Sequence, residues 1–465
     1  MTTDTELIRL SAAASMLLDS IRRAGGHPLI VGGAVRDALL GVAPKDIDVE
    51  VHGDTDTAVL LTEIAKVGTV RERGRSFAIL AAQVNGEDFD VSLARHGEEN
   101  ASERIATRLA EGEHTNISDA FAQRDLTINA IGWDPASGKL IDPFGGLRDL
   151  NAGVLRATSN AFGKDPLRVW RVVQFAGRFG FQVEDNTAAT CRRIALQMQN
   201  QPEAVAQERI WMEWSKLLRV GKHWQAAAAA LVATGAIMLL PELAATLTVP
   251  QDPTWHPEGN VFTHLTLSAQ AAADSCTHGG ITGDDREVAV LGALLHDLGK
   301  VTHTQIGSVT GRITSYGHAQ AGVGQARAFL HRIGAPSHII RRVVPVVAEH
   351  MSHVSVHGTP SRPTLRRLAR RLAPASLTDW ARVVDADSAG RGSGAKASPA
   401  ATWLSVAAAD PIGTAPILKG RHLISLGLEP GPEFAGILHK ALQAQDEGAF
   451  ADEEGALVWA RANLN

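Results

Sequence analysis

The spacing of hydrophobic positions along this chain changes near residue 160. Before that point, short apolar runs with alternating polar residues are separated by glycine turns, a pattern typical of β-strands. After it, apolar residues recur every three or four positions almost to the end, which is typical of amphipathic helices. The pattern therefore predicts an α+β fold, with a small mixed sheet and helices at the N-terminus and an all-α remainder.

Several elements can be placed within the first 150 residues. Gly25-Gly26 would end a first helix, and Asn85-Gly86 is a strong hairpin turn between two strand-like runs. The predicted elements are a helix over 2–24, a strand over 29–31, a helix over 35–40, and strands over 47–51, 76–84 and 89–93.

Prolines and glycines divide the helical remainder. Pro202, Pro241 and Pro257 would interrupt helices, and the Gly-, Ala- and Ser-rich stretch 389–399 is typical of a linker before a final helical piece. We expect four domains over 1–155, 156–250, 251–395 and 396–465.

Composition narrows the class of protein. The 465 residues carry a formal charge of −5, so any nucleic-acid site must be a local patch. Two isolated cysteines, Cys191 and Cys276, exclude a disulfide framework and a thiolate zinc site. The run 226–241 is shorter than the ~18 apolar residues of a membrane span, and the first residues lack signal-peptide order. We expect a cytoplasmic protein without a membrane partner.

One segment is locally basic. Residues 325–371 contain nine arginines and one acid, Glu349. Such a segment could contact a phosphate backbone or form a solvated basic face, and the sequence leaves both interpretations open.

Acidic residues in the N-terminal part indicate a metal site. Asp46 and Asp48 are two apart on a predicted strand, so both carboxylates should share one face, and Asp90 lies on a strand that could pair beside them. Clustered carboxylates favour Mg²⁺, as in the two-metal sites of polymerases. Gly32-Gly33, at a strand-to-helix turn, and Arg36 would face phosphate. The alternative is a solvated strand edge.

The run LIVGGAVRDALLG over 29–41, followed by Asp46-Ile47-Asp48, resembles the first signature of class II CCA-adding tRNA nucleotidyltransferases and related bacterial poly(A) polymerases. The resemblance implies a polymerase-β-like nucleotidyltransferase head. It also implies catalysis by Asp46, Asp48 and Asp90, Mg²⁺ on Asp46 and Asp48, and tRNA, CTP and ATP as partners.

Further motifs follow in the family's order. RDLTINA over 124–130 resembles the second motif, whose polar residues handle ribose and triphosphate. DPFGGLRD over 142–149 resembles the turn into the neck, and ERIWME over 208–213 resembles the fifth motif, which braces the neck helices. Together with the base-selecting segment, the implied nucleotide-binding residues are Gly32, Gly33, Arg36, Arg124, Asp125, Asn129, Asp165, Arg168 and Arg171.

The segment 164–171 occupies the place of the motif that selects the incoming base. A carboxylate and a guanidinium, here Asp165 and Arg168, complement the amine and unprotonated ring nitrogen of cytosine and adenine, whereas guanine and uracil would leave polar groups unpaired. Lys164 replaces the usual Glu, which is expected to hold the arginine, and Gln123 replaces an Arg. Both departures bear on fidelity more than on activity.

A second constellation lies in the helical half. His296-Asp297 ends an apolar run, and buried polar residues there need partners such as a metal. LLHDLGK over 294–300 resembles the HD phosphohydrolase signature, and WHPEGN over 255–260 fits the branch of CCA-adding enzymes with an HD domain. The resemblance implies Ni²⁺, Mn²⁺, a similar divalent ion or Mg²⁺, and hydrolysis of 2′-phosphates or 2′,3′-cyclic phosphates. The implied ligands are His264, His296, Asp297, His318, His350 and Asp387.

The leading interpretation is therefore an enzyme that adds C, C and A to tRNA without a template and carries an HD phosphohydrolase domain. Alternatives with the same chemistry are a poly(A) polymerase and an enzyme that adds only CC or only A. Alternatives of another class are an HD phosphohydrolase with an RNA-binding head and an RNA-binding scaffold with two inactive sites. The sequence leaves the oligomeric state open.

Overall fold

A computed structural model describes residues 7–53, 55–72, 79–93, 117–392, 397–409 and 415–464. Its internal contacts divide the chain into two units. The first contains 1–176, 180–201 and 233–235, and the second contains 177–179, 202–232 and 236–465. Each unit is described by itself.

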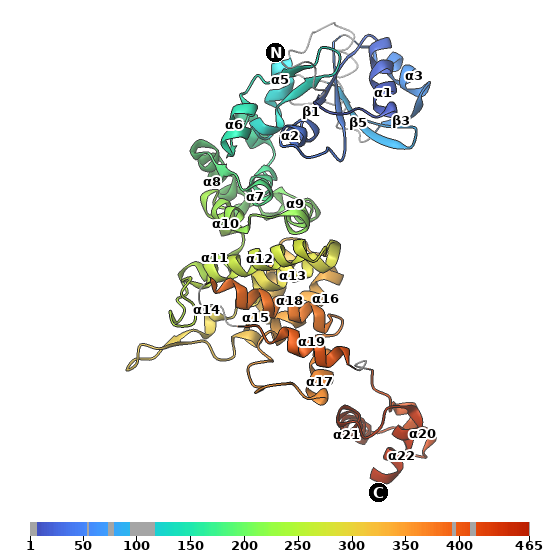
Figure 1. Ribbon diagram of the computed structural model, residues 1–465, viewed down its shortest axis with the longest axis vertical. Coiled ribbons are helices and arrows are strands. Elements are labelled where there is room, and N and C mark those ends of the chain that lie inside the picture. Colours follow the sequence, from blue (N-terminus) through green and yellow to red (C-terminus); the bar gives the residue numbers. More distant parts are fainter. Residues whose placement is uncertain are drawn as a thin grey trace. The chain divides into compact units, whose positions relative to one another are not determined.

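The first unit is built on one mixed sheet (Figure 1). Its strand order is β3-β4-β5-β2-β1-β6-β7, and all neighbours are antiparallel except β2 and β5. The strands are β1 (His27–Val31), β2 (Asp48–His52), β3 (Gly68–Glu72), β4 (Ile79–Val84), β5 (Glu87–Leu93), β6 (Gly132–Asp134) and β7 (Lys139–Ile141).

Both faces of this sheet are covered because the inner strand β1 is apolar on both sides. Ile30 of β1 packs into a core with α1 (Ala12–Arg23) and α3 (Thr57–Ala65), which lie together beside the sheet in Figure 1. Leu29 and Val31, which alternate with Ile30, pack instead against Phe121 of α5 (Ile117–Ala122). The alternation of period two thus separates two cores.

The sequence predicted six elements of the head, which correspond to α1, β1, α2 (Gly33–Leu39), β2, β4 and β5, but not α3, β3, α5, β6, β7 or α6 (Gly146–Ala152). The predicted hairpin is confirmed: Asn85 and Gly86, both with positive φ, connect β4 to β5. The first helix begins at Ala12 rather than residue 2, because the Ser11 hydroxyl accepts a hydrogen bond from Ala14 N and caps it. Residues 2–6 and 76–78 of the predicted elements lie outside the described residues.

The predicted helical remainder is confirmed. After α2 (Gly33–Leu39), η1 (Thr127–Asn129), α6 (Gly146–Ala152) and η2 (Asn160–Lys164), helices follow almost continuously. They are α7 (Arg168–Phe179), α8 (Asp185–Asn200), α9 (Gln207–Val220), α10 (Trp224–Ala233), α11 (Pro241–Ala244), α12 (Val261–His278), α13 (Gly283–Leu295), α14 (Lys300–His303), α15 (His318–Arg332), α16 (Ser337–Glu349), α17 (Arg362–Leu372), α18 (Leu377–Gly390) and α19 (Ala400–Ala408).

Small sheets and short turns interrupt these helices. They comprise β8 (Val154–Leu155) with β9 (Gln182–Val183), β10 (Gln305–Ile306) with β11 (Ile313–Thr314), and the turns η3 (Pro202–Ala204), η4 (Ala236–Leu239) and η5 (Ala245–Thr248). No helix among the described residues combines the length and apolar character needed to cross a membrane.

The C-terminal helices have a core of their own. Leu418, Leu423, Ala441, Phe450 and Ala456 gather between α20 (Gly420–Ser425), α21 (Glu433–Glu447) and α22 (Glu453–Asn463). Of the predicted linker, the helix α18 takes 389–390, and 393–396 lie outside the described residues.

Candidate active sites

The packing of the apolar core determines which face of the sheet carries the carboxylates of β2 and β5. Val49 of β2 and Phe89 and Val91 of β5 face the core beneath α1 and α3. Side chains alternate along a strand, so Asp48 and Asp90 must face the opposite side. The two strands are parallel and Asp48 is the register partner of Asp90, which brings both acids side by side at the start of β2.

Asp46 lies two residues before the first residue of β2. The predicted strand would have included Ile47, but β2 begins at Asp48 and Asp46 sits in the preceding bend. The shared-face argument therefore holds for Asp48 and Asp90 and does not apply to Asp46. Asp46 is nevertheless close: desolvation, and then the charges of Asp90 and Asp46, raise the pKa of Asp48, although Arg124 opposes them. This carboxylate lies among acids at an exposed strand end.

A glycine turn borders these acids, as predicted. Gly32 joins β1 to α2 with φ of +69°, and a Cβ there would lie 2.9 Å from Arg124 Nη1 and 3.9 Å from Asp48 Oδ2. Glu50 fixes this arginine, because Arg124 Nη2 donates to Glu50 Oε2 at 2.6 Å. Glu50 is buried and serves to hold Arg124 rather than to extend the acidic cluster.

Four of the predicted nucleotide-binding residues form a single network. Arg36 Nη1 donates to Asn129 Oδ1 (2.5 Å), and Asn129 Nδ2 donates to Asp125 Oδ1 (2.9 Å). Arg171 Nε donates to Asp125 Oδ2 (2.7 Å). Burial works to raise the pKa of Asp125, but Arg171 and these hydrogen bonds lower it overall. Arg36 is buried and also donates a hydrogen bond to Asp37, so the network stabilises the turn at Gly33.

Asp165 and Arg168 meet at the start of α7. Asp165 Oδ1 accepts from Leu167 N (3.1 Å), as a helix-capping residue does. Arg168 donates to two carbonyl oxygens, Ala161 O (2.8 Å) and Gln123 O (2.5 Å). The two departures from the family pattern touch each other, because Lys164 Nζ lies 3.4 Å from Gln123 Oε1. Arg168 is therefore held by backbone groups, without help from residue 164.

The six predicted ligands of the HD domain all converge in the second unit. His264 on α12, His296 and Asp297 after α13, and Asp387 on α18 are buried. His264 Nε2 lies 3.2 Å from His296 Nε2 and 3.1 Å from Asp387 Oδ1, and His296 Nε2 lies 3.4 Å from Asp297 Oδ2. Donor atoms that share an ion at about 2.1 Å lie roughly 3 to 3.5 Å apart, so these four atoms have the spacing of one coordination sphere.

A second group shares Asp297. Its other oxygen, Oδ1, lies 2.9 Å from His318 Nε2 and 3.6 Å from His350 Nε2, and these two nitrogens are 3.2 Å apart. Asp297 can thus bridge two cation positions. Among the described residues, three groups of histidines and carboxylates could hold a metal ion.

The tautomers show that these residues fit a metal. Nδ1 of His296 pairs with Ala293 O, and Nδ1 of His350 pairs with Val347 O. A carbonyl oxygen only accepts, so each Nδ1 carries the hydrogen and each Nε2 presents a lone pair. Nδ1 of His318 pairs in the same way with Ser315 O, so the Nε2 lone pairs of His318 and His350 face each other at 3.2 Å and repel unless a cation lies between them. The donor set of imidazoles and carboxylates suits a divalent metal.

Charged neighbours surround this centre. Lys300 Nζ lies 2.6 Å from Asp297 Oδ2, and Arg391 Nη2 lies 3.0 Å from both oxygens of Asp387. Burial opposes ionisation of Asp297, but Lys300 and the histidines hold the pKa of Asp297 well below its ordinary value. Both carboxylates are therefore in the ionised, metal-binding form.

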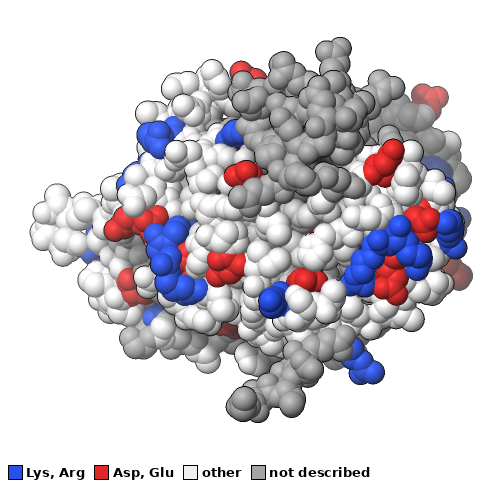
Figure 2. Space-filling model, turned by 90° about the horizontal axis from the view of Figure 1, so that it is seen from above, with Lys and Arg blue, Asp and Glu red and all other residues white. Residues whose placement is uncertain are grey.

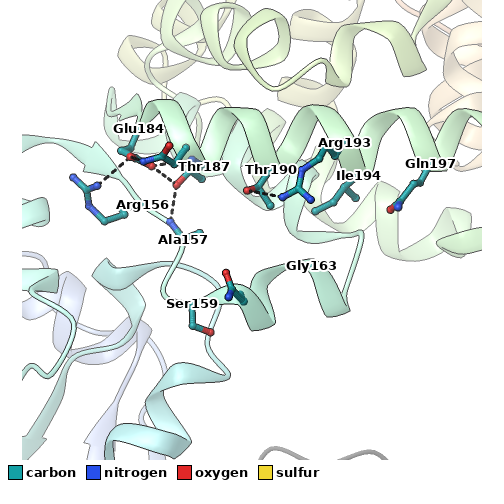
Figure 3. Close-up of a pocket in the computed structure, with 12 residues that line it drawn as sticks. Arg156, Ala157, Ser159, Gly163, Glu184, Thr187, Thr190, Arg193, Ile194 and Gln197 are labelled. Carbon is teal, nitrogen blue, oxygen red and sulfur yellow. Dashed lines mark hydrogen bonds and ion pairs between the residues drawn. The ribbon is translucent and has the colours of Figure 1, made fainter.

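A polar pocket lies in the first unit between η2 and α8 (Figure 3). Its volume is about 560 Å³. Arg156 is neutralised by Glu184 (3.2 Å), whereas the single polar contact of the Arg193 guanidinium within the described chain is a long one to Thr190 Oγ1 (3.4 Å). The lining consists of Arg156, Ala157, Ser159, Asn160, Gly163, Glu184, Asn186, Thr187, Thr190, Arg193, Ile194 and Gln197.

Much of the basic segment is neutralised within the fold. Arg370 forms a two-pronged pair with Asp446, Arg342 contacts Asp285 and Asp379, and Arg371 contacts Glu349. Figure 2 shows a different part of the surface, seen from the top of Figure 1, where basic and acidic side chains of the described residues are also interspersed. For Arg342, Arg370 and Arg371 the structure thus shows ion pairing within the fold, which is neither of the two interpretations of 325–371.

Sequence reasoning missed several supporting residues. Nothing in the position of Glu50 along the sequence signals that it binds an arginine 74 residues away. Lys300 was part of a motif without a role. His256 and Glu258 were noticed only as a family feature, although a His-Pro-Glu turn six residues before a histidine ligand is a detectable signal.

Comparisons with known proteins agree with this architecture. Residues 29–156 match the poly A polymerase head domain, 180–247 match the "probable RNA and SrmB-binding site of polymerase A", and 261–386 match the HD domain. Two solved structures share the fold: a Bacillus stearothermophilus CCA-adding enzyme with CTP (TM-score 0.61, 18% identity, 97% of each chain) and a Thermotoga maritima CCA-adding enzyme with tRNA (TM-score 0.53, 20% identity, 97% and 94%).

Similar chains are also known from bacteria. A multifunctional CCA protein of Halorhodospira halophila is 34% identical over 433 residues, which cover 88% of this chain and 94% of the relative. One from Neisseria meningitidis is 34% identical over 342 residues, or 73% and 76%. This chain therefore belongs to the family of the multifunctional CCA proteins.

Proposed function

We propose that this protein adds C, C and A to the 3′ end of tRNA from CTP and ATP, and that its HD domain hydrolyses phosphoesters. The observation that carries the first activity is the register pairing of Asp48 with Asp90 beside Gly32 and Arg124. It places paired carboxylates next to a backbone turn and a cation, which is what a nucleoside triphosphate and its metal require. Family membership supports the same activity.

Each residue of the head then has a role. Asp46 and Asp48 would hold Mg²⁺, which supplies charge neutralisation when bound, and Asp90 would orient the tRNA 3′ hydroxyl for attack on the α-phosphate. Arg124, fixed by Glu50, would bind the triphosphate. Gly32 allows the phosphates to approach the backbone because no Cβ blocks the turn.

The base would be read at the start of α7. Arg168 would donate to the ring nitrogen of cytosine or adenine, and the Asp165 carboxylate would accept from the exocyclic amine. Arg171 and Arg36 reach the site through Asp125 and Asn129, so they would position it.

The HD centre supports metal-dependent hydrolysis. His264, His296, Asp297 and Asp387 would hold one divalent ion, and His318, His350 and Asp297 a second. Such ions activate water at neutral pH. We expect a transition metal such as Ni²⁺ or Mn²⁺, because two imidazoles at each position favour it over Mg²⁺. We expect 2′-phosphates or 2′,3′-cyclic phosphates as substrates.

We also infer an RNA contact at the polar pocket beside α8. Its lining carries two arginines against one glutamate, and Glu184 already neutralises Arg156, so Arg193 is the cation available to a phosphate. The match of 180–247 to an RNA-binding model supports this assignment. Arg193→Ala should weaken tRNA binding 3- to 10-fold and leave the KM for CTP unchanged, whereas Arg22→Ala, an exposed arginine on α1, should change neither.

The test of the whole proposal is product analysis. Purified protein with a tRNA that ends at the discriminator base should incorporate C from CTP, and a further A once ATP is also present. Incorporation of only A without limit would indicate a poly(A) polymerase, and incorporation of only CC or only A would indicate one half of a split pair. Conversion of a 2′,3′-cyclic nucleotide to a nucleoside monophosphate, and release of phosphate from a nucleoside 2′-monophosphate, both with added Mn²⁺ or Ni²⁺, test the HD activity.

A further inference from the structure

His256 and Glu258 lie in the turn that precedes α12, beside the HD centre but outside its ligand set. Glu258 Oε1 lies 2.8 Å from His256 Nδ1 and 2.7 Å from Nδ1 of the ligand His264. The two imidazole rings meet edge to face at 4.8 Å. One carboxylate oxygen therefore contacts Nδ1 of both histidines.

This contact distinguishes His264 from the other three histidines of the centre. Nδ1 of His296, His318 and His350 pairs with a backbone carbonyl three residues earlier, at 2.6 to 2.9 Å. Only His264 has a charged acceptor behind it. A carboxylate draws the Nδ1 hydrogen more strongly than a carbonyl, so it makes Nε2 a stronger electron donor toward a metal.

The contact between Glu258 Oε1 and His264 Nδ1 is short but not linear. The Glu258 oxygen lies off the N–H direction of the His264 ring, so Nδ1 of His264 has no straight hydrogen bond. Nδ1 is completely buried, and Glu258 supplies the one acceptor in reach among the described residues.

The contacts of Glu258 continue through His256 and Lys300 to the ligand Asp297. His256 Nε2 lies 3.5 Å from Lys300 Nζ, which in turn contacts Asp297 Oδ2 (2.6 Å) and Gln251 Oε1 (2.7 Å). Because Nδ1 of His256 donates to Glu258, its Nε2 is the acceptor that faces the ammonium group. Residues outside the six predicted ligands thus connect His264 to Asp297.

We propose that Glu258 is a positioning residue of the HD centre, which fixes the tautomer of His264 and biases the cation position at His264, His296, Asp297 and Asp387 toward ions that prefer imidazole over Mg²⁺. His256 and Lys300 extend the same support to Asp297. The position at His318 and His350 lacks such a carboxylate, so the two positions differ in metal preference. This inference rests on the proposed metal binding of the HD domain.

The test measures metal binding rather than turnover. Full-length protein stripped of metal is titrated with Co²⁺, followed by calorimetry and by the visible absorption of Co²⁺, and separately with Mg²⁺. Glu258→Gln keeps the shape of the side chain and removes its charge. Glu242→Gln is the matched control, because Glu242 pairs with Arg332 and has no contact with the centre.

Glu258→Gln should weaken binding of Co²⁺ at one of two positions by 10- to 100-fold and change Mg²⁺ binding by less than 3-fold. His256→Ala should weaken Co²⁺ binding by a smaller factor, and Glu242→Gln should leave it unchanged. CCA addition serves as the check that each variant is folded.

Two results would overturn the proposal: Co²⁺ affinity of Glu258→Gln within 3-fold of the original protein, or an equal loss for Co²⁺ and Mg²⁺. If Glu258→Gln does not fold, the same comparison applies to His256→Ala, for which an unchanged Co²⁺ affinity would contradict the network. Absence of Co²⁺ binding in the original protein would instead refute the metal site itself.

Discussion

At the scale of single residues, the candidate sites depend on polar side chains that are fixed by partners distant in sequence. Asp125 is held by Arg171, and Arg124 by Glu50. The residue types and their order could be predicted from the sequence because they recur in recognisable motifs. Their partners could not, because each partner is set by the topology of the sheet and not by spacing along the chain.

Replacement of Lys164 should have little effect on base choice. Arg168 is anchored by the carbonyl groups of Ala161 and Gln123, so Lys164→Ala should change the ratio of CTP to UTP incorporation by less than 3-fold. Arg168→Ala should reduce that ratio by 10-fold or more, because one base-reading donor is lost. Single-nucleotide incorporation with each NTP measures both, and a large effect of Lys164→Ala would show that residue 164 holds the arginine after all.

The thiol of Cys191 should be inert in the folded protein. It is fully buried, and desolvation raises its pKa to about 12. An unfolded thiol ionises near its ordinary pKa, so this raised value contributes stability at neutral pH that is lost as the pH rises from about 9 toward 12. Ellman's reagent at pH 8 should react with Cys191 only after denaturation, and rapid reaction of native protein would contradict the burial.

At the scale of elements, the alternation of β1 and β2 decides the geometry of the head. Hydrophobic periodicity predicted β1, β2, β4 and β5, and the Asn85-Gly86 turn predicted the hairpin, since both signals are local, but β3, β6 and β7 were not predicted. It could not predict that β2 pairs with β5 in parallel and in the register that joins Asp48 to Asp90, because that pairing depends on segments 42 residues apart. The start of α1 was missed because a single serine cap decides it.

Gly32→Ala should damage nucleotidyl transfer more than stability. The φ of +69° and ψ of −126° suit glycine alone, so the substitution should cost about 2 kcal/mol in the free energy of unfolding. The added Cβ would also displace the Arg124 guanidinium. We expect a loss of at least 10-fold in kcat/KM for CTP with a Tm lowered by a few degrees, measured by primer extension and calorimetry. Full activity would exclude the turn from the site.

Arg370 should attach the C-terminal helices to α17. It pairs through two hydrogen bonds with Asp446, which is 2% exposed. Arg370→Ala would leave that buried carboxylate without its ion-pair partner, at a cost of about 2 kcal/mol after allowance for the partly exposed arginine. Limited proteolysis should then release fragments from 415–464 faster, while Arg367→Ala should not change the rate. Equal rates for both variants would refute this role.

At the scale of the whole molecule, the chain carries two metal-type constellations in two structural units. The change from strand to helix periodicity near residue 160 predicted an N-terminal part with a sheet and a helical remainder. The domain boundaries at 155, 250 and 395 remain predictions, and the contact-based division falls elsewhere, near residue 201. The six HD ligands lie in or directly after five different helices, so, apart from the adjacent His296 and Asp297, only family resemblance could have grouped them.

The two activities should separate by mutation. His296→Ala with Asp297→Ala should abolish hydrolysis of a 2′,3′-cyclic nucleotide and leave CCA addition within 3-fold, because those residues lie only in the second unit. Parallel assays of both reactions on one preparation measure this. Loss of both activities together would show that the HD centre is needed for the fold or for transfer.

The most direct test of the account is single-turnover extension of a tRNA that ends at the discriminator base, with CTP, ATP and Mg²⁺, by the original protein and by Asp48→Asn and Asp90→Asn variants. The account predicts a product three nucleotides longer, ending in CCA. It also predicts a fall of about 100-fold or more for Asp48→Asn and a smaller but clear fall for Asp90→Asn. Full extension by Asp48→Asn would contradict it.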